Sequence, residues 1–110
     1  MDQTLALAAL SALSQVTRLD TFQLLVRHEP EGLPAGEVAR QLDIPQNTMS
    51  AHLSKLARAG LVVSERHSRS IVYRADLDQL RALMLFLAKD CCGGTPALCA
   101  PLIADLAPCC

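Results

Sequence analysis

One stretch of sequence decides the fold: EVARQLDIPQNTMSAHLSKLARAG, residues 37–60. Its first part, Glu37 to Leu42, predicts a short helix with its apolar residues turned inward. Asp43-Ile44-Pro45 ends that helix, because proline disfavours helical geometry in the residue before it. A second helix follows at once and ends at Gly60, since glycine is the usual residue just past a helix end.

The second helix of this stretch has two different faces. Met49, Leu53, Leu56 and Ala57 recur at helical spacing and predict a buried stripe. The other face carries polar, basic or small residues, namely Asn47, Ser50, Ala51, Ser54, Lys55 and Arg58. A short helix, a tight turn and a second helix of this kind are the arrangement that places a helix in the major groove of DNA. The stretch therefore predicts a helix-turn-helix.

The residues after Gly60 predict a basic hairpin. Leu61–Val63 and Ile71–Tyr73 read as two short strands around a polar turn at residues 67–70. From Gln46 to Ala75 there are five Lys or Arg and one Glu, a charge of +4, so the rest of the chain carries −5 of the total of −1. A local basic surface on an acidic protein favours contact with nucleic acid, the alternative being an ordinary solvated face.

Two helices precede the stretch and one follows the hairpin. Residues 5–13 form the first, and Thr17 to His28 the second, with Thr17 and Asp20 as a capping box. Pro30, Gly32 and Pro34 predict a loop. Asp76 caps the last helix, in which Leu77, Leu80, Met84, Leu87 and Cys91 alternate at spacings of three and four. The first and last helices have more apolar surface than a small domain can bury, so a partner should cover them.

Composition agrees with one helical domain. Of 110 residues 51% are hydrophobic and only 3% aromatic, so the core is built from Leu, Ala, Val and Ile, which favours helices over a β-sandwich. No stretch approaches the ~20 apolar residues of a membrane span, and no positive segment begins a signal peptide. We expect a cytoplasmic protein, mostly α with a small β-hairpin, with no membrane contact. Residues 1–90 form the DNA-binding and dimerisation domain and residues 91–110 a cysteine-rich tail.

The order of these elements resembles the ArsR/SmtB family of metalloregulatory repressors across about Leu5 to Asp90. The similarity is carried by Thr17-Arg18-Leu19, Val38-Ala39, Leu42, Thr48 to Leu53, Leu56, Ala59 to Val62, and Arg66 to Tyr73. It implies a winged helix-turn-helix repressor that binds double-stranded operator DNA as a homodimer through its first and last helices. Pro45 departs from the pattern, since it stands where such families usually carry a small hydroxyl N-cap.

The resemblance also implies which residues contact DNA. His52 is counted among them, although it shares a face with Met49 and Leu56, where a packing role is the simpler interpretation. Neither this histidine nor the other two has a partner at the spacing of an active site, so no enzyme is expected. The implied contacts are Gln46, Asn47, Thr48, Ser50, His52 and Lys55 in the groove or on phosphates, and Arg66 and Arg69 on the wing.

All five cysteines lie in the last twenty residues, at 91, 92, 99, 109 and 110. The family's arsenic site on the third helix and its zinc site on the last helix lack their ligands here. The pattern resembles instead the subgroup with adjacent cysteines at the end of the last helix and a third in the tail. This implies trivalent arsenic as inducer, with antimonite as an alternative, on Cys91, Cys92 and Cys99.

The chemistry of the thiols suits a trivalent metalloid, because three of them give arsenic a neutral product whereas zinc usually takes a fourth ligand. Zinc or cadmium on four thiolates, and oxidation to a disulfide, remain open alternatives. A different class is a winged-helix protein-interaction module with a metal-trafficking tail that never touches DNA. The basic wing discriminates against that class, which has no need of it.

Overall fold

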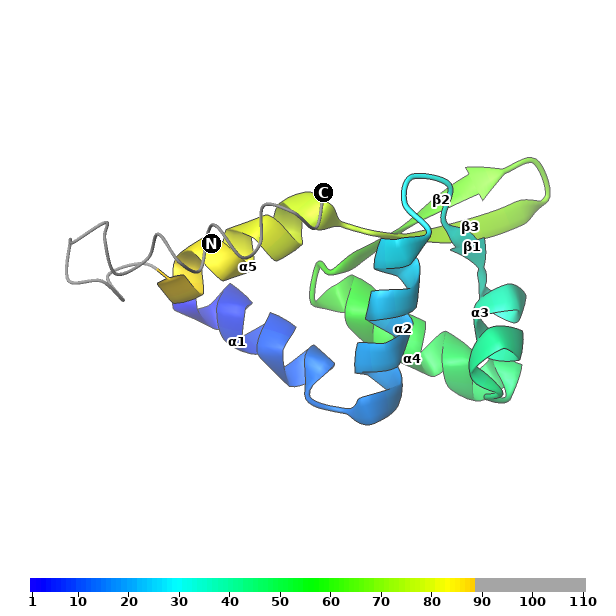
Figure 1. Cartoon of the computed structure of the whole chain (residues 1–110), viewed down its shortest axis with the longest axis horizontal. Coiled ribbons are helices and arrows are strands. Elements are labelled where there is room, and N and C mark those ends of the chain that lie inside the picture. The colour runs from blue at the N-terminus through cyan, green and yellow to red at the C-terminus, as the bar shows by residue number, and fades with distance from the viewer. Residues whose placement is uncertain (89–110) are drawn as a thin grey trace.

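The computed structural model describes residues 1–88, and over these residues the chain forms helices and a small sheet (Figure 1). In chain order the elements are α1 (Gln3–Leu13), α2 (Val16–Arg27), β1 (Leu33–Pro34), α3 (Ala35–Leu42), α4 (Gln46–Arg58), β2 (Val62–His67), β3 (Ser70–Ala75) and α5 (Leu77–Ala88). Helices α1 and α5 lie side by side at one end, and α3, α4 and the β2–β3 hairpin lie toward the other. The predicted winged helix-turn-helix fold is confirmed.

Helix α4 lies at the centre of the core. Met49, Leu53 and Leu56 are fully buried, and α4 contacts α1, α2, α3 and β2. Burying a side chain of this size contributes about 1.5–3 kcal/mol to folding. The predicted stripe is thus confirmed except at Ala57, which is exposed. Eight residues beyond Met49 a helix has turned about 80° past it, so the Ala57 methyl points to the flank.

The turn of the helix-turn-helix is built by Asp43 and Pro45. Asp43 adopts a left-handed backbone with φ 55°, and the Ile44 N–H donates to the Ala39 carbonyl over 2.9 Å. Pro45 is the N-cap of α4 and makes no side-chain capping bond. The preceding helix begins at Ala35, two residues before the predicted Glu37, because Pro34 is compatible with the N-cap position.

The predicted cap of α2 is wrong, whereas that of α5 is confirmed. Helix α2 begins at Val16, and the Arg18 N–H donates to Gln15 Oε1 over 2.8 Å. Thr17 lies inside the first turn, where its carbonyl accepts from the Thr21 hydroxyl. At α5 the Gln79 N–H donates to Asp76 Oδ1 over 3.1 Å.

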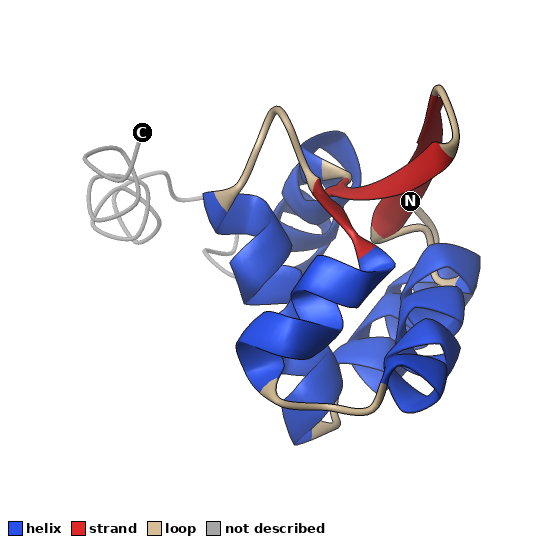
Figure 2. Cartoon of the chain, turned by 90° about the vertical axis from the view of Figure 1, so that its right-hand side faces the viewer, coloured by secondary structure: helices blue, strands red, loops and turns tan. Residues whose placement is uncertain are grey.

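The sheet has three strands where two were predicted. Residues 30–34 were expected to be loop throughout, but Leu33 and Pro34 pair with Tyr73 and Val72 of β3. Strands β2 and β3 pair antiparallel from Val62↔Ala75 to His67↔Ser70, longer than predicted at both strands. Figure 2 shows this sheet beside the helices. A strand of two residues has no periodicity to detect, and Pro34 is tolerated because β1 is an edge strand.

Gly32 allows β1 to reach β3. Its φ is +73°, and a Cβ there would lie 2.5 Å from the Tyr73 carbonyl oxygen. Only glycine adopts this conformation at little cost and permits so close an approach. Within residues 1–88, no helix is long and apolar enough to cross a membrane.

We predict opposite effects of alanine at two neighbouring glycines. Gly32→Ala should lower the free energy of unfolding by more than about 1 kcal/mol, because it adds backbone strain and a clash. Gly36→Ala is the matched control, since a Cβ there would lie 3.6 Å from its nearest neighbour. It should be neutral or stabilise by up to about 1 kcal/mol. Urea denaturation measures both, and equal effects would contradict the role given to Gly32.

Candidate nucleic-acid interface

The outward face of α4 is exposed and rich in hydrogen-bonding groups. Of the predicted contacts on this helix, Gln46, Asn47, Thr48, Ser50 and Lys55 are exposed, and His52 is half-buried. Amide and hydroxyl side chains can both donate and accept hydrogen bonds, as the base edges of the major groove require. The structure brings these side chains onto one accessible helix.

Two further residues belong to this face. Ser54 and Arg58 are exposed and share the stripe opposite the core with Asn47 and Ala51, at spacings of four, three and four. The contacts predicted from the sequence ended at Lys55. The sequence analysis had placed both residues on this face of the helix without counting them among the DNA contacts.

His52 is turned away from that stripe. It is half-buried, and its Nδ1 lies 3.5 Å from Nη1 of Arg18 at the start of α2. Burial, together with the charges of Arg18 and Lys55, lowers the pKa of the imidazole. The ring is therefore neutral near pH 7 and adds no charge to the surface.

The hairpin carries exposed arginines at and near its tip. Arg66 is on β2, and Arg69 is in the turn beside Ser68, which has a φ of 58°. Both side chains are exposed, and neither has a carboxylate within 4.0 Å among the residues that the structure describes. They are suited to phosphate contact, which needs charge on an accessible projection.

Arg74 does not belong to the basic surface with which it was counted. Its guanidinium donates to Glu29 over 2.9 and 3.1 Å and to Glu65 over 2.6 Å. These bonds raise the pKa of Arg74, and the bond from Arg74 lowers that of Glu65. The cation is thus neutralised within the protein and ties the hairpin to the loop after α2. Lys55, Arg58, Arg66 and Arg69 remain as the accessible cations of the segment.

The predicted metalloid ligands Cys91, Cys92 and Cys99 lie outside the described residues, as does the whole tail at 91–110. In the part of the chain that is described, no three His, Cys, Asp or Glu side chains gather where they could hold a metal ion.

The predicted excess of apolar surface on the terminal helices is confirmed. On α1 and α5, Met84 is 37% exposed and Leu87 53%, and the other large exposed apolar residues are Leu5, Leu7, Leu10, Leu77 and Leu85. Leu80, on the same helix, is half-buried and packs partly against the chain's own core. An apolar face of this extent usually marks an interface.

Comparisons with known proteins agree with this geometry. The model of a family described as "Helix-turn-helix domain" matches residues 13–65. The chain is 28% identical to the transcriptional activator HlyU of Vibrio cholerae over 87 residues, which is 79% of this chain and 78% of that protein.

Solved structures of similar proteins extend the match. An ArsR-like transcriptional regulator from Rhodococcus sp. RHA1 superposes on this chain with a TM-score of 0.75 at 27% identity. The match covers 88% of this chain and 89% of the regulator's chain. A second solved structure, that of Mb0332 from Mycobacterium bovis, is described as a homodimeric winged helix-turn-helix DNA-binding domain of a possible ArsR-family regulator. It gives a TM-score of 0.63 at 26% identity, with 79% and 81% of the two chains covered.

The bond between Arg74 and Glu65 predicts that the free energy of unfolding depends on pH. Because the pKa of Glu65 is lowered in the folded protein, its contribution to stability is complete above its ordinary value of 4.5 and is lost as the pH falls below. The stability difference between wild type and Glu65→Gln should therefore be constant near neutral pH and shrink toward pH ~3. Denaturation at a series of pH values measures it. A difference that grew on acidification would contradict this assignment.

Proposed function

The chain belongs to the ArsR family of winged helix-turn-helix transcriptional regulators, and we propose that it is a homodimeric repressor released from its operator by trivalent arsenic. It is a regulator and not an enzyme. The observation that carries the DNA-binding part is the exposed polar face of α4 beside a wing with two accessible arginines. Because a regulator acts where the chromosome lies, we propose a cytoplasmic location.

Helix α4 is proposed to enter the major groove. Gln46, Asn47, Thr48 and Ser50 lie in its first half, where a recognition helix meets base edges. Amide side chains can bind adenine through two hydrogen bonds, and hydroxyls adapt to several bases. Lys55, Arg66 and Arg69 would contact phosphates, which fix the position of the helix and supply affinity.

We predict that Arg69→Ala weakens binding to specific and random duplexes alike, because a phosphate contact reads no sequence. The slope of log affinity against log salt should fall by about one. Arg81→Ala is the matched control, since Arg81 is an exposed arginine on α5 and should leave the slope unchanged. Fluorescence anisotropy over a salt series measures both variants. An unchanged slope for Arg69→Ala would remove the wing from the interface.

A second copy of the chain is the proposed cover for the apolar face of α1 and α5. The Mycobacterium bovis relative described as homodimeric supports this assembly. A two-fold dimer would also set the spacing between two α4 helices, and hence between two operator half-sites.

We predict that Leu87→Asp disrupts the dimer, since it would bury an unpaired carboxylate at the interface. Ile71→Asp is the control, because Ile71 is a similarly exposed apolar residue, at 46%, on the hairpin. That variant should remain dimeric. Sedimentation velocity gives the result, and a stable wild-type monomer at micromolar concentration would overturn the assembly.

Arsenic is proposed as the inducer from the donor set of the sequence. Soft thiolates select soft metals and metalloids, and Cys91, Cys92 and Cys99 supply the three that arsenic requires. Cys91 is three positions after Ala88, which is the last described residue of α5. A ligand that favours the form of the dimer unable to bind DNA would shift the equilibrium toward release. Coupling of 1–3 kcal/mol would weaken operator binding about 5- to 150-fold.

We predict that Cys99→Ser abolishes arsenite-induced release of DNA, whereas the double variant Cys109→Ser/Cys110→Ser retains it. The assay is titration of fluorescent upstream DNA with arsenite, and parallel titrations with antimonite, zinc and an oxidant distinguish the alternative inducers. The reverse pattern would show that the third ligand is at 109 or 110. No response to either metalloid in wild type would exclude the arsenic assignment.

A further inference from the structure

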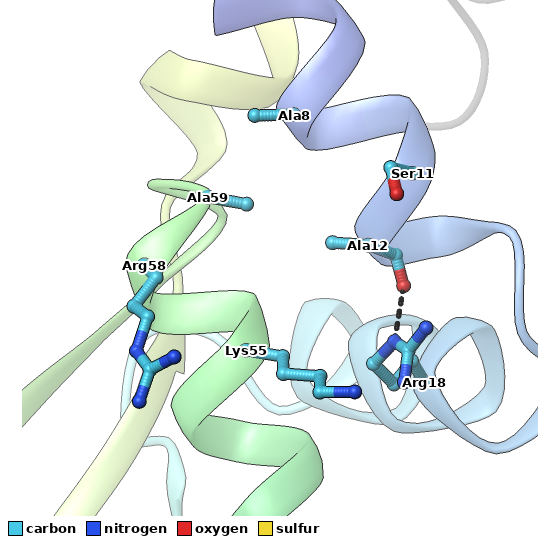
Figure 3. A pocket seen from close by; sticks show the side chains of 7 residues that line it. All are labelled: Ala8, Ser11, Ala12, Arg18, Lys55, Arg58 and Ala59. Atoms are coloured by element: carbon cyan, nitrogen blue, oxygen red, sulfur yellow. Dashed lines mark hydrogen bonds between the residues drawn. The ribbon is translucent and has the colours of Figure 1, made fainter.

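A pocket lies where α1, the start of α2 and the second half of α4 meet, and Lys55 is the one predicted DNA contact that lines it. Its volume is about 370 Å³ (Figure 3). Small side chains leave this space open, and three cationic side chains surround it. The lining residues are Ala8, Ser11, Ala12, Arg18, Lys55, Arg58 and Ala59.

The cations of this pocket lack counter-charges. Within residues 1–88, no carboxylate lies within 4.0 Å of Arg18, Lys55 or Arg58. Arg40 and Arg74 elsewhere in the protein are, by contrast, bound to glutamates. Like charges gathered in a hollow raise the local positive potential and concentrate anions there. The same potential contributes to the lowered pKa of His52, which borders Arg18.

Arg18 is held in position before any ligand binds. Its Nε donates to the Ala12 carbonyl over 2.7 Å, and its backbone N–H donates to Gln15 Oε1 over 2.8 Å. Figure 3 shows the Lys55 amine directed toward Arg18, whereas Arg58 extends along the other side of α4. Because the guanidinium has several N–H donors, fixing it through Nε leaves others for a ligand.

We propose that this pocket binds a phosphate group. Arginine offers paired donors that match phosphate oxygens, lysine adds a point charge, and the Ser11 hydroxyl adds a further donor at the rim. The phosphate comes either from the DNA backbone, in which case the inference rests on the proposed function, or from a free phosphate compound. Arg58 lies on the exposed stripe of α4 and so connects the pocket to the DNA-facing surface.

A phosphate bound here would join three helices. Its partners lie on α2 and α4, and Ser11 lies on α1, which carries part of the apolar dimer face. The ligand would therefore connect the assembly helix with the recognition helix, and binding at one would depend on the position of the other.

The test places a carboxylate in the pocket without removing its cations. In Ser11→Asp the new carboxylate occupies the phosphate position, and Ser11→Asn is the uncharged control of equal shape. Ser11 is exposed, so both variants should fold, and thermal melting checks this. Ala8→Asp and Ala8→Asn repeat the comparison from a second exposed lining residue.

Two assays on the full chain distinguish the sources of phosphate. If the DNA backbone is bound, Ser11→Asp should bind duplex DNA about tenfold more weakly than Ser11→Asn and show a salt slope lower by about one. If a free compound is bound, inorganic phosphate or pyrophosphate at constant ionic strength should shift the Arg18 Nε–H resonance of DNA-free wild type. Ser11→Asp should abolish that shift.

Either result supports phosphate binding in the pocket, and each identifies the source of the phosphate. A wild-type protein that binds DNA, with Asp and Asn variants of equal affinity and no shift with either phosphate, overturns the inference while the proposed function stands. A protein that binds no DNA but responds to phosphate overturns the proposed function and supports the pocket.

Discussion

The burial of one side of α4 determines the rest of the structure. Met49, Leu53 and Leu56 have no exposed surface, and together they fix the rotation of the helix about its axis. Because successive residues of a helix are about 100° apart, burying these three turns Asn47, Ala51 and Ser54 to solvent. The core that holds the helix is mostly aliphatic, and the buried Thr21 hydroxyl lies 3.5 Å from the Met49 sulfur. This packing positions a polar surface suited to DNA.

The arginines of the hairpin have two different roles: one is ion-paired within the protein, and two are accessible at the surface. Arg74 is bound to Glu29 and Glu65 and connects the hairpin to the loop after α2. Arg66 and Arg69, on the same hairpin, remain free of carboxylates among the residues described. Because these bonds join the hairpin to a segment far away in the sequence, they also fix the orientation of the wing. The pocket at Arg18 and Lys55 is a second place where, within residues 1–88, no carboxylate lies near the positive charge.

Most of the fold could be predicted from the regular periodicity of the sequence. Features that depend on contacts between distant segments could not be predicted in this way. The buried stripe from Met49 to Leu56 follows from spacing alone, and so does the cap at Asp76. Thr17 matched a capping pattern by chance, and the edge strand at Leu33 depends on pairing with Tyr73. Of the two partners of Arg74, Glu65 is nine residues away but Glu29 is 45 residues away, so the full neutralisation of Arg74 could not be predicted from local charge. The polar face of α4 was predictable because it is the complement of the stripe, whereas the Arg18 pocket requires three helices to be placed together.

The proposed function rests on DNA contact at the outward face of α4 and the wing. The most direct test is a titration of isotope-labelled protein with duplex DNA from its own upstream region, followed residue by residue with NMR. DNA contact there should give shifts concentrated at Asn47, Ser50 and Ser54 of α4 and at Arg66 and Arg69 of the hairpin, with Leu25 and other core residues little changed. Shifts confined to the apolar face of α1 and α5, or none at saturating DNA, would contradict it and favour a protein-interaction module.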